Sequence, residues 1–183
     1  MSVESFIERA QDGSRSGDSA LCALFLKSAA GKLEEYRSRI EVCLGKLDDA
    51  QIWARGSENE NAIGNLILHL CGNVRQWIVC SLGGQPVDRN RDGEFDARGG
   101  FTAAELAGRL RETIDAAAAV IERLTAEQLT STYEIQIYKA SGVEAVFHVV
   151  EHFGYHAGQI VFATKMLTHS DLGFYSHLRG NWQ

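Results

Sequence analysis

The sequence lacks the features of a membrane-inserted or secreted protein. Each apolar stretch is interrupted by His, Asn, Glu or Arg before it reaches the roughly 18 residues that indicate a membrane-spanning helix. The first residues also do not combine a basic segment with an apolar one, which is the pattern of a signal peptide. We therefore expect no membrane partner and no cleaved leader.

Dense runs of Lys and Arg are missing as well. The formal net charge is -6 and the sequence pI is near 5.5. Domains that bind a phosphate backbone usually carry clustered positive charge on one face. We therefore expect no nucleic-acid partner.

The four cysteines form no CxxC motif. They lie within apolar helical patterns, at Cys22, Cys43, Cys71 and Cys80. Such cysteines are typical of small buried side chains and not of disulfides or a zinc knuckle. Free thiols suit a reducing compartment, so we expect a cytoplasmic protein.

The 183 residues, of which 45% are hydrophobic, have the size and composition of one globular domain. Apolar residues recur every three or four positions in four segments, which predicts four amphipathic helices. We expect these helices over residues 18–47, 57–82, 102–123 and 141–167. The alternation in residues 133–138 predicts one short extended segment before the last helix.

Four capping boxes of the type S/T-x-x-E/Q mark starts of helical structure. They are Ser57 with Glu60, Thr102 with Glu105, Thr125 with Gln128, and Ser141 with Glu144. The first, second and fourth boxes predict where the last three long helices begin. The third predicts a short helical turn.

Residues 84–100 have no helical period, and their mixed charges are typical of a solvated loop. Antiparallel neighbouring helices need only short links, so this connection can carry the chain across a bundle. The predicted fold class is all-α, a four-helix bundle with a long crossover between helices two and three. We expect residues 1–17 to be a polar N-terminal tail, 18–169 the bundle, and 170–183 a tail that packs on the bundle or a partner.

Three histidines lie four residues apart in the last predicted helix, at His148, His152 and His156. Residues four apart share a helix face. Because the first and third are separated by roughly 12 Å of helix rise, all three cannot bind one ion unless the helix breaks. A consecutive pair can, and His69 is the best candidate for a further ligand.

The second predicted helix carries a polar column beside its apolar stripe, formed by Asn65, His69, Asn73 and Gln76. Polar groups that border a core need partners, because burying them unpaired is costly. We therefore favour a metal site formed by His69, His152 and His156. The alternative is that the histidines of the last helix form a solvated or hydrogen-bonded face.

Three neutral imidazoles leave open positions on a metal, which is typical of catalytic sites. Imidazole suits zinc, nickel, copper and iron alike, so the residue types do not identify the element. We expect a divalent transition metal and favour zinc or nickel. His148 is a candidate for supporting a ligand or transferring a proton, Gln159 for orienting a ligand, and Asn73 and Tyr155 for binding substrate. The last helix has no HExxH motif, so it does not favour peptide hydrolysis.

The segments NAIGNLILHLCGNVRQW and EHFGYHAGQI resemble the DinB/YfiT-like superfamily, whose members place one His on helix two and an HxxxH pair followed by GQ on helix four. The resemblance covers about residues 20–167. It implies a four-helix bundle with a crossover, a homodimer, and a divalent metal bound by His69, His152 and His156. His148 and the tail after His169 depart from the simple pattern.

Three functions are compatible with this resemblance. Some members are similar to metal-dependent transferases that attach thiols such as bacillithiol, mycothiol or glutathione to electrophiles, and one branch isomerises maleylpyruvate. The first hypothesis is therefore a thiol S-transferase with a small-molecule substrate, acting in detoxification or stress response. The second is a metal-dependent hydrolase, and the third is a non-catalytic metal-binding bundle or dimeric interaction module.

Overall fold

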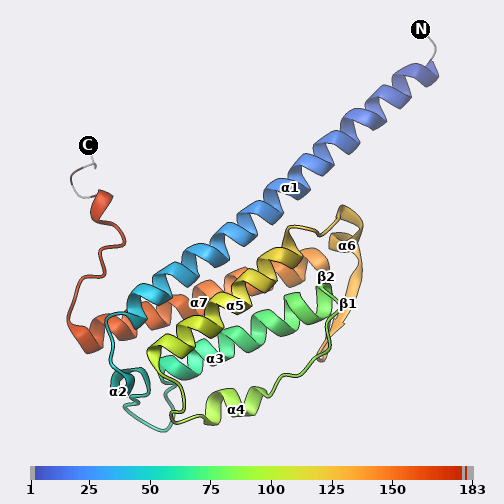
Figure 1. The fold of residues 1–183 in the computed structure, drawn as a ribbon. Helices are drawn as coiled ribbons and strands as arrows, with labels where there is room; N and C mark the ends of the chain where they lie inside the picture. Colours follow the sequence, from blue (N-terminus) through green and yellow to red (C-terminus); the bar gives the residue numbers. More distant parts are fainter. Residues whose placement is uncertain (1–2, 179, 181–183) are drawn as a thin grey trace.

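Four long helices form the bundle seen in Figure 1. The computed structural model describes residues 3–178 and residue 180, with side chains from residue 18 onward. The long helices are α1 (Val3–Leu44), α3 (Ile63–Val74) continued by η1 (Arg75–Leu82), α5 (Ala103–Ile121) and α7 (Gly142–Thr168). The predicted all-α bundle is confirmed. Helix α1 starts at Val3 and not near residue 18, and its first half extends beyond the other helices.

Short elements join the long helices. They are α2 (Asp49–Ile52), α4 (Arg91–Asp96), α6 (Ala126–Thr130), β1 (Thr132–Ile135), β2 (Tyr138–Ser141) and η2 (Ser176–Leu178). Strands β1 and β2 pair antiparallel, with Ile135 opposite Tyr138 at the turn. The predicted single extended segment is therefore part of a hairpin. Gln136 in its turn has φ 58, a left-handed conformation that is uncommon for a residue with a side chain.

The long connection crosses the bundle as predicted. In Figure 1 the chain leaves the end of η1, runs back past α4, and starts α5 at the end where α3 also starts. Helices α3 and α5 are therefore parallel. The connection contains the helix α4, which the sequence did not predict, and the side chain of Asn90 caps it by accepting a hydrogen bond from the Gly93 N–H at 3.0 Å.

The core lies between the four long helices and is built mainly from aliphatic side chains. Fully buried members are Leu33 and Ile40 from α1, Ile67 and Leu70 from α3, Leu106, Leu110, Ile114 and Ile121 from α5, and Phe153 and Ile160 from α7. Their three-and-four spacing is the one that predicted the helices. This core holds α3 and α7 side by side, which positions the site described below.

Three of the four predicted capping boxes are formed, at Thr102, Thr125 and Ser141. The box predicted at Ser57 is wrong, because α3 begins only at Ile63. Glu60 accepts a hydrogen bond from the Gly56 N–H at 2.8 Å and so closes a turn before the helix.

The remaining predictions concern the membrane, the cysteines and the tail. Among the described residues, the helices are too short or too polar to cross a membrane. All four cysteines are free, as predicted. The C-terminal segment contacts α1, where Arg39 donates to the Tyr175 hydroxyl at 3.1 Å and lies 5.4 Å from the Phe174 ring centroid. The division into two tails and a bundle stays a prediction.

Candidate metal site

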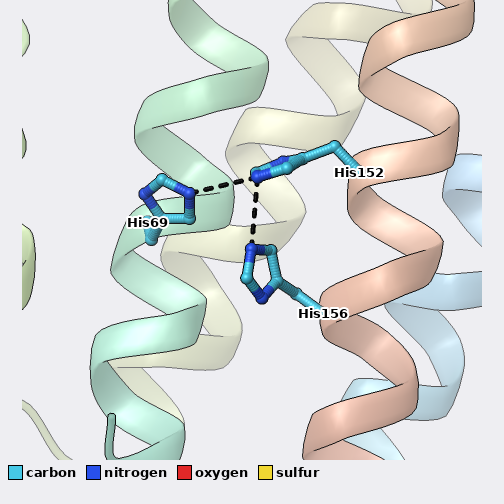
Figure 2. A group of neighbouring side chains, drawn as sticks. All are labelled: His69, His152 and His156. Atoms are coloured by element: carbon cyan, nitrogen blue, oxygen red, sulfur yellow. Dashed lines mark hydrogen bonds between the residues drawn. The ribbon is translucent and has the colours of Figure 1, made fainter. Parts of the chain in front are cut away.

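Three imidazoles converge between α3 and α7 (Figure 2). The Nε2 atom of His152 lies 3.2 Å from Nε2 of His69 and 3.1 Å from Nε2 of His156. One ligand nitrogen from each ring lies within 4.8 Å of the others. The two predicted segments, more than eighty residues apart in the chain, therefore meet where the sequence pattern placed them.

Glu94 orients the His69 ring. Its Oε2 lies 3.1 Å from Nδ1 of His69, and both side chains are buried. An ionised carboxylate can only accept a hydrogen bond. Nη2 of Arg89 also lies 3.1 Å from Nδ1, but it donates to Oε2 of Glu94 at the shorter distance of 2.7 Å, so we place the ring proton on Nδ1, which leaves Nε2 with a free lone pair. A carboxylate behind a histidine is the usual support of a metal-binding imidazole.

The other two rings are supported differently. His156 contacts Oε1 of Gln159 through Nδ1 at 2.7 Å, which is the orienting contact proposed for Gln159. His152 lies between the other two rings, and its Nδ1 is buried without a hydrogen-bond partner among the described residues. The His152 ring is therefore held by packing against its neighbours.

Burial keeps the imidazoles of α7 neutral. It lowers the pKa of His152 to about 3, and the neighbouring His156 and His69 add to this shift. Burial also lowers the pKa of His156, although the hydrogen bond with Gln159 opposes the change. A neutral imidazole offers a lone pair to a metal without first losing a proton.

The crossover supplies a buried ion pair to the site, which the sequence prediction of a solvated loop missed. Arg89 donates to Glu94 through Nε at 2.8 Å and through Nη2 at 2.7 Å, a paired arrangement of two bonds. Burial alone would raise the pKa of Glu94, but hydrogen bonds from Arg89 and His69 outweigh it and lower the pKa. Glu94 is therefore held as a carboxylate.

The polar column of the second predicted helix was the signal that could have indicated these residues. Asn65 donates through Nδ2 to the Glu94 carbonyl at 2.9 Å, and Gln76 accepts from Arg89 at 2.8 Å. Together with His69, three of the four column residues thus find partners in the crossover. Asn73 does not, since its buried Oδ1 has no partner among the described residues.

A cavity of about 390 Å³ lies beside the histidines. His69, His152, His148 and Asn73 line it. Tyr155, predicted to bind substrate, does not line it but is exposed, with its ring edge against His156 at 5.2 Å between centroids.

The His148 ring lies 4.2 Å from the Trp77 ring and stacks at 5.4 Å on that of His152. Burial lowers the pKa of His148, and Glu151 partly opposes this. The ring is therefore placed in the cavity wall, next to the central imidazole.

The donor set fits a divalent transition metal. Two imidazole nitrogens bound to one tetrahedral zinc ion lie roughly 3.3 Å apart, close to the separations around His152. The three ring nitrogens, two of them on oriented rings, could hold one ion and leave a coordination position free. These imidazoles do not specify which metal binds.

Over residues 20–181 the chain matches the family described as "Protein of unknown function (DUF1572)". The chain belongs to this family. Its fold is DinB-like, as the sequence resemblance predicted. A comparison with curated proteins found no match.

Solved structures of DinB-like proteins support the fold of this DUF1572 member. YjoA from Bacillus subtilis superposes with a TM-score of 0.62 at 18% identity, covering 81% of this chain and 96% of its own. A DinB-like protein from Bacillus cereus superposes with a TM-score of 0.62 at 15% identity, and the match covers 78% of this chain and 90% of that protein. A conserved protein from Enterococcus faecalis superposes with a TM-score of 0.68 at 11% identity, and the match covers 79% of this chain and 97% of that protein. At these identities the likeness concerns the fold.

Substitution of Gly72 tests whether the position of the Glu94 side chain controls metal affinity. A Cβ added there would overlap the Glu94 carboxylate, so Gly72→Ala must displace that side chain from His69. We expect metal affinity to fall about 10–100-fold, measured by competition with a chelating dye. Gly108→Ala is the matched control, because a Cβ there meets nothing within 4 Å and should leave affinity unchanged. Unchanged affinity in Gly72→Ala would contradict the orienting role of Glu94.

Proposed function

We propose that this chain is a metal-dependent enzyme that transfers a low-molecular-weight thiol to an electrophile. The observation that carries the proposal is the convergence of His69, His152 and His156 beside a cavity that two of them line. A site built only to stabilise the fold usually surrounds its ion with four protein ligands. Three ligands beside a cavity leave room for a substrate.

The metal would be a divalent ion, zinc or nickel, held by these three histidines. When bound, it would lower the pKa of a thiol beside it and stabilise the negative charge on sulfur. We expect the reaction in the cytoplasm, where such thiols are kept reduced, and in the detoxification of electrophiles under stress.

His148 is suited to move the proton. Burial lowers the pKa of its ring, which further favours the neutral form at pH 7, and the ring lines the cavity next to His152. A neutral ring nitrogen of His148 takes the thiol proton, and the sulfur then bonds to the electrophilic carbon. The leaving group departs with the electron pair of its bond to that carbon.

An assay with several thiols tests the proposal. The metal-loaded protein is incubated with monochlorobimane and, in turn, with cysteine, glutathione, bacillithiol or mycothiol, and fluorescence of the conjugate is followed. We expect metal-dependent conjugation with at least one thiol, lost in His152→Ala. Ester hydrolysis without any thiol would instead mark a hydrolase, and metal binding without either reaction would mark a non-catalytic module.

We also propose that the chain forms a homodimer through the exposed side of α7. Four large apolar side chains project there, Phe147, Tyr155, Phe162 and Met166, each between 59% and 67% exposed. Gly158 lies on the same side, where an added Cβ would meet nothing within 4 Å. A helix that is apolar on its outer side as well as its inner side normally has a partner there.

Charge favours antiparallel packing of two α7 helices. Glu151 and Lys165 are both exposed and lie seven residues before and after Gly158. If two copies cross at Gly158, Glu151 of one chain faces the partner's Lys165, and the reverse pair forms by symmetry. This pairing makes the apolar face self-complementary.

Phe162→Glu is expected to make the protein monomeric, because it places an unpaired carboxylate inside this interface. The dimer dissociation constant should rise at least about 100-fold, measured by analytical ultracentrifugation. Ile137→Glu, in the exposed turn of the hairpin, makes the same chemical change away from α7 and should stay dimeric. A Phe162→Glu dimer as tight as wild type would place the interface elsewhere.

A further inference from the structure

Among the described residues, the side chains that line the cavity beside the histidines include two arginines and no carboxylate. The residues that line it are His69, Asn73, Trp77, Arg89, Arg91, Gln136, Tyr138, His148 and His152. Two of them are arginines and none is Asp or Glu, in a chain whose formal net charge is -6. At about 390 Å³ the space is in the range that holds small organic ligands.

The two arginines differ in what they already bind. Arg89 already donates hydrogen bonds to the Glu94 carboxylate and to Gln76. Arg91 lies over the Phe95 ring at 5.0 Å and makes no ion pair with any described residue. A guanidinium without a carboxylate partner, at the edge of a cavity, suits a carboxylate on a ligand.

Asn73 provides a second unpaired polar group. The residue is only 5% exposed and lines the cavity one helical turn after His69, yet its Oδ1 has no hydrogen-bond partner among the described residues. A buried amide in this state costs stability unless a ligand pairs with it. Since rotating the amide by 180° exchanges its oxygen and nitrogen, it can serve a donor or an acceptor.

Aromatic rings form the remaining wall. The Trp77 ring lies 6.0 Å from that of Tyr138 and 4.2 Å from that of His148. Gln136, with its left-handed φ of 58, brings the hairpin turn to the same rim.

We propose that this cavity binds a small molecule that carries both a carboxylate and an amide, with the carboxylate paired to Arg91 and the amide paired to Asn73. The inference rests on the proposed function, because it identifies the thiol substrate as a carboxylate-bearing one. The aromatic wall of Trp77 covers the apolar part of the molecule. The thiol end of the molecule lies toward the histidines.

The test measures binding by isothermal titration calorimetry to the zinc-loaded and the metal-free protein. The probes are N-acetyl-L-cysteine, its neutral analogue N-acetyl-L-cysteinamide, and N-acetyl-L-alanine, which keeps the carboxylate and lacks the thiol. We expect the zinc-loaded protein to bind N-acetyl-L-cysteine at least about tenfold more tightly than the cysteinamide. N-acetyl-L-alanine should bind detectably with and without zinc.

Single-residue variants test which side chains produce the preference for the carboxylate-bearing probe. Arg91→Gln should remove the tenfold preference for the carboxylate, whereas Arg123→Gln, which deletes the same charge at the end of α5 away from the cavity, should keep it. Asn73→Leu should weaken binding of both cysteine probes about tenfold without lowering Tm, because it removes an unpaired buried amide. A purely structural Asn73 would instead lose stability on this change.

The outcomes separate this inference from the proposed function. Equal affinity for the acid and the amide, or a preference that survives Arg91→Gln, would overturn the inference even if thiol conjugation is observed. Binding of N-acetyl-L-alanine that depends on Arg91, without conjugation by any thiol, would support the cavity's ligand class and remove the transferase function.

Discussion

His152→Ala is expected to yield a folded protein with no stoichiometric metal. His152 lies between the other two rings, at 3.2 Å from His69 and 3.1 Å from His156 between Nε2 atoms. Removing it leaves two nitrogens from different helices, which do not hold a divalent ion tightly. We expect about one zinc or nickel ion per wild-type chain by elemental analysis, and at least about a 100-fold loss of affinity in the variant, beyond what loss of a supporting contact costs.

His169 provides the matched control for this experiment. It lies at the C-cap of α7 with φ 50, is exposed, and does not belong to the histidine cluster. His169→Asn removes one imidazole and keeps a residue that tolerates the left-handed conformation, so metal content should not change. Equal metal content in His152→Ala and wild type would show that the ion binds elsewhere, and the proposed chemistry would lose its site.

Glu94→Ala is expected to be the most destabilising single change near the site. The Arg89 and Glu94 side chains are only 6% and 9% exposed. Removing the carboxylate leaves the Arg89 guanidinium buried without its partner, which typically costs about 3–5 kcal/mol. We expect a loss of this size in urea unfolding. Metal affinity should fall about 10–100-fold as well, since His69 loses the acceptor that orients its ring.

A double variant separates these two effects. Arg89→Met combined with Glu94→Leu replaces the ion pair by apolar side chains of similar size, which is often neutral for stability. We expect the free energy of unfolding to recover most of the loss while metal affinity stays low, because His69 still lacks an acceptor. Wild-type metal affinity in the double variant would show that Glu94 does not orient His69.

Sequence patterns predicted much of the fold and the three histidines of the site, but not the Arg89 and Glu94 side chains behind them. The three-and-four spacing of apolar residues predicted the four long helices, and three capping boxes predicted where helical structure begins. Spacing of four residues placed His152 and His156 on one helix face, and both do meet His69. These features depend on residues near each other in the chain, which is why the sequence carries them.

The capping signal failed at Ser57, because a local motif can form equally well in a turn. The prediction that the crossover is a solvated loop was wrong for a related reason. Its charges have no helical period, and only the folded chain shows that Arg89 and Glu94 are buried behind His69. The burial of a charged residue depends on which distant surface covers it, and a periodicity pattern contains no such information.

The amino-acid order thus decided which side chains could form a metal site and on which helix faces they lie. The packing of α3 against α7, together with the returning crossover, decided that the His69 ring is oriented by a carboxylate, that Asn73 lacks a partner, and that Arg91 faces a cavity and Tyr155 does not. The first kind of property arises from backbone geometry over a few residues. The second arises from contacts between segments that only close packing brings together.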